Sequence, residues 1–145
     1  MIVFIVIALV LFLDQLTKWL VRAHFLLGES YDVIEGVFSI TYIENKGAAF
    51  GLGEGNAFVF VLVAIIVSVV MIYYYKGQEK NFWLSFGVSL ILSGAWGNLI
   101  DRVMKGSVTD MFNFHIWPVF NIADIAVCLG CFFFILYIFK EPNKR

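Results

Sequence analysis

Charged residues are scarce in this chain, at 14% of its 145 residues, whereas soluble domains contain about 25%. Hydrophobic residues make up 61% of the sequence. This composition indicates a protein embedded in a membrane and leaves no room for a separate soluble domain. The net charge is only −1, so nothing in the charge balance suggests a nucleic-acid partner.

The chain also has few residues that bind metals or form disulfides. Cys128 and Cys131 lie in one apolar run, which argues against a disulfide framework and predicts that both are small buried hydrophobic residues. His24 and His115 are too few and too far apart in sequence to indicate a metal site. No H-E-x-x-H motif, G-x-S-x-G motif or suggestive Ser–His pair is present. We therefore expect neither a metal nor a cofactor.

Four apolar segments are each long enough to cross a membrane core of about 30 Å as a helix. The first lacks the basic region and the small-x-small cleavage site of a signal peptide, so we expect it to be retained. Pro118 suits the start of the fourth, because its missing N–H falls in the unpaired first turn. The predicted spans are residues 2–21, 57–75, 82–103 and 119–139.

The connecting segments predict an orientation and a small sheet. Lysines in the 76–81 loop and in the C-terminal tail place both termini in the cytoplasm, because cytoplasmic loops are enriched in basic residues. Residues 22–56, which are acidic, and residues 104–118 are then extracytoplasmic. Within them, residues 37–43 and 108–117 are rich in β-branched and aromatic residues and predict strands.

Polar residues interrupt the apolar spans, although each ionisable residue in a membrane core costs about 2.5–3.5 kcal/mol. At about 1.5 Å per residue, Asp14 lies about 20 Å from the inner face, and Asp124 about 8 Å below the outer face. Spacings of three, four, seven and eight residues place them on single helix faces. We expect one site in the outer third of the bilayer, formed by Asp14, Lys18, Gly94, Asn98, Asp101, Arg102, Asn121 and Asp124.

Two aspartates flank the last connection. Asp110 lies just outside the third span and Asp124 just inside the fourth, so the intervening loop can bring them together above the bundle. Paired carboxylates in a low-dielectric site share a proton. An ionised carboxylate can then take a proton from water while its protonated partner polarises a carbonyl group. This pair therefore predicts hydrolysis.

Two alternatives belong to other functional classes. A proton-coupled transporter could use Asp14, Lys18, Asp101 and Asp124 as a relay, but the inner halves of the spans carry no charge and no repeated halves are visible. A lipid-binding scaffold without enzymatic activity would not need two neighbouring acids at the mouth of the bundle.

Five short motifs occur along the chain in this order: Asp14-x-x-x-Lys18, Asn45-x-Gly47-Ala48-Ala49-Phe50, Gly94-x-x-Gly97-Asn98-Leu99-Ile100-Asp101-Arg102, Val108-x-Asp110 and Phe120-Asn121-x-Ala123-Asp124. Together they closely resemble the lipoprotein signal peptidases (signal peptidase II). These are aspartic peptidases of the bacterial cytoplasmic membrane, which cut prolipoproteins just before a diacylglyceryl-modified cysteine. The resemblance implies four transmembrane helices, an extracytoplasmic β-cradle and a short amphipathic helix.

The resemblance also implies roles for individual residues. Asp110 and Asp124 would be the catalytic pair. Asn45, Asn98, Arg102 and Asn121 would line the site and hold the substrate or the tetrahedral intermediate, and Asp14, Lys18 and Asp101 would support the pocket. The implied partners are a lipid-modified prolipoprotein and membrane lipids. We expect one membrane-embedded domain over residues 1–145, acting as a monomer, with its site near the outer face.

Overall fold

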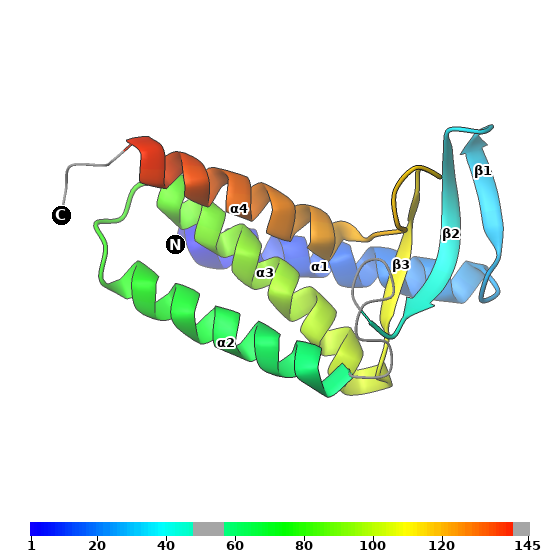
Figure 1. The fold of residues 1–145 in the computed structure, drawn as a ribbon, viewed down its shortest axis with the longest axis horizontal. Helices are drawn as coiled ribbons and strands as arrows, with labels where there is room; N and C mark the ends of the chain where they lie inside the picture. Colours follow the sequence, from blue (N-terminus) through cyan, green and yellow to red (C-terminus); the bar gives the residue numbers. More distant parts are fainter. Residues whose placement is uncertain (48–56, 141–145) are drawn as a thin grey trace.

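The computed structural model describes residues 1–47 and 57–140, which form four long helices and one three-stranded antiparallel sheet (Figure 1). All four helices are long and apolar enough to span a membrane. The predicted class, a multi-pass helical protein with a small sheet, is therefore confirmed. The elements are α1 (Ile2–His24), β1 (Ser30–Ile34), β2 (Phe38–Asn45), α2 (Ala57–Lys76), α3 (Phe82–Lys105), β3 (Val108–Asn113) and α4 (Ile122–Lys140).

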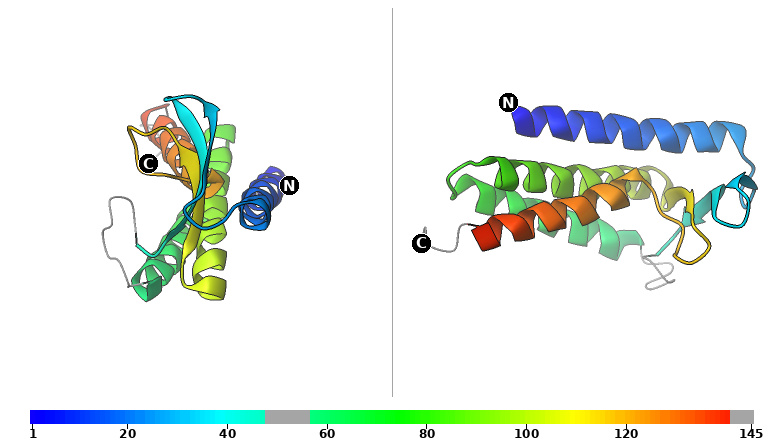
Figure 2. Two further views of the ribbon diagram at one scale, coloured as in Figure 1. Left: turned by 90° about the vertical axis from the view of Figure 1, so that its right-hand side faces the viewer. Right: turned by 90° about the horizontal axis from the view of Figure 1, so that it is seen from above.

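The helices run side by side, and the sheet lies across one end of the bundle (Figures 1 and 2). Helix α3 is central, because it contacts each of the other three helices. Helix α1 begins, and α4 ends, at the end of the bundle away from the sheet (Figure 1). The sheet end of the bundle therefore holds the second half of α1 with Asp14 and Lys18, the last turns of α3 with residues 98–102, and the first turn of α4 with Asp124.

Small residues bring the backbones of α3 and α4 into direct contact. A Cβ atom at Gly94 would collide with the carbonyl oxygen of Ala123, and one at Gly130 would lie 2.7 Å from the backbone nitrogen of Ile91. Helices in lipid associate closely where small residues line the contact. Gly94 therefore acts here by packing, and this contact brings the polar end of α3 against the first turn of α4.

The helix boundaries differ from prediction mainly at the start of α4. Helices α1, α2 and α3 extend one to three residues past the predicted ends, whereas α4 begins at Ile122 and not at 119. The expectation that Pro118 occupies the first turn is therefore wrong. A reciprocal capping pair starts the helix instead: the Asn121 Oδ1 atom accepts from the Asp124 N–H at 3.0 Å, and the Asp124 Oδ2 atom accepts from the Asn121 N–H at 3.1 Å.

The sheet has the order β1-β2-β3 and differs from prediction in one strand. Strand β1 was not predicted, because all five of its residues are exposed and it has no buried face to produce alternation. Strand β3 ends at Asn113 and not at 117, since His115 adopts a left-handed conformation with φ of 61°. The implied amphipathic helix has no counterpart in residues 1–47 and 57–140, and the motif residues 48–50 lie outside that range.

Candidate active site

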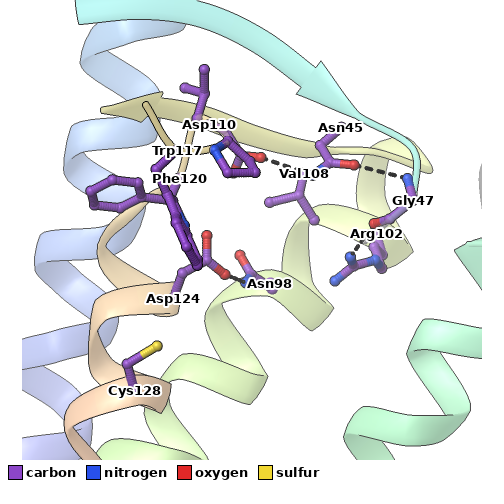
Figure 3. Close-up of a pocket in the computed structure, with 12 residues that line it drawn as sticks. Asn45, Gly47, Asn98, Arg102, Val108, Asp110, Trp117, Phe120, Asp124 and Cys128 are labelled. Carbon is purple, nitrogen blue, oxygen red and sulfur yellow. Dashed lines mark hydrogen bonds between the residues drawn. The ribbon is translucent and has the colours of Figure 1, made fainter. Parts of the chain in front are cut away.

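Asp110 and Asp124 line one cavity of about 290 Å³ between the sheet and the helix ends (Figure 3). The predicted residues Asn45, Asn98 and Arg102 line the same cavity. Strand β3 carries Asp110, which pairs with Ile43 of β2, and the first turn of α4 carries Asp124. The fold therefore brings together the two carboxyl groups that the sequence places 14 positions apart.

Asp110 is almost completely buried, with 2% of its surface exposed. Its Oδ1 atom accepts a hydrogen bond from Asn121 Nδ2 at 2.6 Å, and its Oδ2 atom accepts one from Asn45 Nδ2 at 3.0 Å. Burial, followed by the nearby charge of Asp124, raises the pKa of Asp110 to about 7, although the two asparagine hydrogen bonds oppose this shift. This carboxyl group can therefore hold a proton near neutral pH.

Asn121 links the two aspartates. Its Oδ1 atom caps α4 by accepting from the Asp124 N–H, and its Nδ2 atom donates to Asp110. Asp124 in turn caps the helix with Oδ2 and accepts from Asn98 Nδ2 through Oδ1 at 2.8 Å. The start of α4 and the position of both carboxyl groups are consequently set by the same side chains.

Behind this cavity, α1 contributes an ion pair that is fully buried. Lys18 Nζ lies 2.9 Å from Asp14 Oδ2, and both side chains have 0% of their surface exposed. Lys18 also donates to Asn98 Oδ1 at 2.9 Å, while Asp14 Oδ1 accepts from the backbone N–H of Ala123 at 3.0 Å. Neither residue lines the cavity, but each holds a residue or a helix turn that does.

Asp101 fixes strand β3 to the helices. Its Oδ2 atom accepts from the backbone N–H of Thr109, next to Asp110, at 3.0 Å. The Asp101 carboxylate also lies 3.5 Å from Lys18, 3.7 Å from Arg22 and 3.8 Å from Lys105.

Three residues of this arrangement were not predicted. Arg22 and Lys105 donate to the Thr109 hydroxyl at 3.0 and 2.7 Å. The available sequence signal was spacing: Arg22 follows Lys18, and Lys105 follows Asp101, by four residues, so each pair shares a helix face. Thr109 carried no comparable signal beyond its position before Asp110.

Arg102 faces the other side of the cavity. Its Nη2 atom donates to the carbonyl oxygen of Gly47 at 2.9 Å, and its guanidinium lies 4.8 Å from the ring centre of Phe60 in α2. Its buried Nε atom has no hydrogen-bond partner within the described part of the chain. Arg102 thus connects α3 to the loop after β2 and lines the cavity together with the two carboxyl groups.

An apolar groove of about 490 Å³ adjoins the cavity and shares Trp117, Phe120, Asp124 and Cys128 with it. The prediction that both cysteines are buried is wrong, since Cys128 and Cys131 are exposed. Cys128 follows Asp124 by one helical turn and faces the cavity with it. The face of α4 buried against the bundle instead carries Ala123, Ala126, Gly130 and Tyr137.

No group of three His, Cys, Asp or Glu side chains able to hold a metal occurs in residues 1–47 and 57–140. The donors around the two carboxyl groups are asparagine amides and backbone N–H groups. Such a set orients two carboxyl groups and leaves each of them able to exchange a proton with a bound molecule. The arrangement can therefore perform acid–base catalysis on a carbonyl compound.

Comparisons with known proteins identify relatives of the whole chain. Residues 6–140 match the profile of the family described as signal peptidase (SPase) II. A lipoprotein signal peptidase of Halothermothrix orenii is 42% identical over 142 residues, covering 97% of each chain. A lipoprotein signal peptidase of Clostridioides difficile is also 42% identical, over 148 residues, covering 100% of each chain.

A solved structure of a bacterial membrane enzyme superposes with a TM-score of 0.91 at 30% identity, covering 99% of this chain and 90% of that one. A second solved structure, also described as a bacterial membrane enzyme, gives a TM-score of 0.87 at 30% identity, covering 96% of this chain and 93% of that one. The four-helix fold with its sheet is thus that of a multi-pass membrane enzyme. Together, the profile and the near-complete relatives show that the chain belongs to the signal peptidase II family of aspartic peptidases.

Proposed function

We propose that Asp110 and Asp124 are the catalytic pair with which this peptidase removes signal peptides from prolipoproteins, cutting before a diacylglyceryl-modified cysteine. The observation that carries the proposal is that both carboxyl groups line one cavity and are tied together by Asn121. The apolar groove that shares Asp124 offers an adjoining surface for the apolar parts of such a substrate.

The chemistry needs one ionised and one protonated carboxyl group. The ionised group removes a proton from the attacking water, and the protonated group donates to the carbonyl oxygen of the scissile bond. Charge that develops on this oxygen is stabilised best by donors already in place. Asn45, Asn98 and Arg102 line the cavity and are the proposed contacts for the substrate backbone, while Asn121 holds the pair.

Four predicted residues support the cavity without lining it: Asp14, Lys18, Asp101 and, through its packing contacts, Gly94. Asp14 holds the first turn of α4, Lys18 holds Asn98, and Asp101 holds the strand that carries Asp110. The competing idea of a transporter relay is less well supported, because these polar residues gather at one end of the bundle and family membership favours hydrolysis.

The proposed setting is the bacterial cytoplasmic membrane, with both termini in the cytoplasm and the site near the outer face. Lys76, Lys80 and Lys140 support this orientation, because they lie at the end of the bundle away from the sheet, and basic residues favour the cytoplasmic side. We further propose that residues 1–145 act as one membrane-embedded peptidase domain and as a monomer.

A cleavage assay tests the proposal. The purified protein is incubated with a diacylglyceryl-modified prolipoprotein, and release of the signal peptide is followed. Asp110→Asn and Asp124→Asn should each abolish cleavage while the protein stays folded. Asp32→Asn is the matched control, because Asp32 accepts from Ser39 in the sheet, does not line the cavity, and can be replaced there by an amide oxygen. Full activity in either variant of the pair would refute the assignment.

A further inference from the structure

We infer that Lys18, acting through Asn98, makes Asp124 the ionised member of the pair and leaves the shared proton on Asp110. Asp124 is then the base that activates water, and Asp110 is the acid that protonates the carbonyl oxygen. The inference rests on the proposed function and adds a separate role for each carboxyl group. Lys18 does not line the cavity, so its role here is to position and polarise another side chain.

The orientation of the Asn98 amide follows from groups that can only donate. Lys18 Nζ lies 2.9 Å from Asn98 Oδ1, and an ammonium group has no acceptor. The Asn98 Nδ2 group must therefore face Asp124 Oδ1, at 2.8 Å (Figure 3). The other oxygen of Asp124 accepts from the backbone N–H of Asn121. Both oxygens thus face donors, and one of these donors is polarised by a buried cation.

The surroundings of Asp110 differ in this last respect. Its two donors are the amides of Asn45 and Asn121. The oxygen atoms of these amides accept from the backbone N–H groups of Gly47 and Asp124, which carry no charge. Asp110 therefore receives neutral donors only, within the described residues, while Asp124 receives one donor backed by an ammonium group. A proton shared by the pair is held more firmly by the carboxyl group that lacks a cationic donor.

Other charges near Asp124 do not remove this difference between the donors of the two aspartates. The charged and titratable groups that face it are Lys18 and Asp14 on α1, Arg102 on α3, Asp110 on β3 and Cys128 on α4 itself. Arg102 interacts electrostatically with both carboxyl groups, so it does little to decide which of them carries the proton. Asp14 opposes Lys18, but its oxygens are already engaged by Lys18 and by the Ala123 N–H. The Lys18 charge acts on Asp110 as well, but the Asn98 Nδ2 group, whose amide oxygen accepts from Lys18, donates to Asp124.

The resulting steps balance. Asp124 takes a proton from water as the water oxygen bonds to the scissile carbonyl carbon, and Asp110 gives its proton to the carbonyl oxygen. When the tetrahedral intermediate collapses, the C–N bond breaks and Asp124 passes its proton to the departing nitrogen. Asp110 recovers a proton from the hydroxyl group as the carbonyl re-forms, which restores the starting state of the pair.

The pH dependence of kcat/KM for prolipoprotein cleavage tests the role of Lys18. Because Lys18→Met alone would leave Asp14 without its partner, the test variant is Lys18→Met/Asp14→Asn, in which an amide oxygen can still accept from Ala123. Without Lys18, ionisation of Asp124 is less favourable, so the acidic limb of the kcat/KM profile should move up by about one pH unit. At a fixed pH on that limb, this shift is about a tenfold loss of kcat/KM. Asp14→Asn alone keeps Lys18 on Asn98 and should not move that limb upward.

Asn98→Ala provides a second test, since it removes the connection while Lys18 keeps its contact with Asp14. It should move the acidic limb in the same direction, because Asp124 also loses the Asn98 donor. A limb that stays in place would overturn the inference even if the double variant does not fold. Loss of activity at every pH with the limb unmoved would show that Lys18 is only structural and would overturn the inference. A wild-type protein that cleaves no lipidated prolipoprotein at any pH would instead refute the proposed function.

Discussion

Replacing Asn45 should change the pH range in which the enzyme is active. The Asn45 amide donates to Asp110 Oδ2 at 3.0 Å, and a hydrogen bond of this kind stabilises the ionised carboxylate. Its loss in Asn45→Ala makes ionisation less favourable, so the pKa of Asp110 rises from its native value of about 7. If Asp110 must be protonated to act as the acid, activity will persist to higher pH.

The size of the shift follows from the strength of that bond. A hydrogen bond to a charged group contributes about 1.5–3 kcal/mol, and 1.36 kcal/mol corresponds to about one pKa unit. At the lower end of this range, the loss corresponds to an upward shift of about one unit. The basic limb of kcat/KM, about pH 7 in the wild type, should therefore lie at about pH 8 in the variant.

The assay is prolipoprotein cleavage between about pH 5 and 9, with each profile scaled to its own maximum so that a change of pH range is separated from a loss of rate at every pH. Asn113→Ala is the control. Asn113 lies on the same strand as Asp110 but donates to Thr41, at 3.2 Å. Its profile should match that of the wild type. A basic limb in Asn45→Ala that stays in place or moves down would refute the argument from the hydrogen bond.

Three further changes test the packing and support of the site. Gly94→Ala should lower stability by about 1–3 kcal/mol, because its Cβ collides with Ala123. Thermal unfolding in detergent measures this, and an unchanged midpoint would contradict the close contact. Asp101→Asn should retain more cleavage activity than Asp101→Ala, since only an amide oxygen can still accept from the Thr109 N–H. Equal activities would argue against that anchor. Trp96→Phe loses one hydrogen bond to α2 and should cost about 1 kcal/mol of stability with cleavage unchanged.

The sequence by itself determined the membrane class and the four helices, and it predicted the pair of aspartates. Helix length and hydropathy are local properties, so the ends of α2 and α3 lie within two residues of prediction. The motifs around Asp110 and Asp124 likewise consist of neighbouring residues. Strand β1 was missed for the opposite reason, since it is exposed on both faces and exists only because β2 lies beside it.

Only the tertiary structure decided which polar residues touch. Lys18 meets Asn98 across 80 positions of sequence, and Asp14 meets the Ala123 N–H across 109. Nothing local specifies such partners, because they depend on how closely α3 and α4 pack and on where each helix begins. The start of α4 at Ile122, set by Asn121 and Asp124 themselves, determines where the second carboxyl group lies. Hydropathy locates the membrane span, but it does not reveal the Asn121–Asp124 cap that fixes where the helix begins.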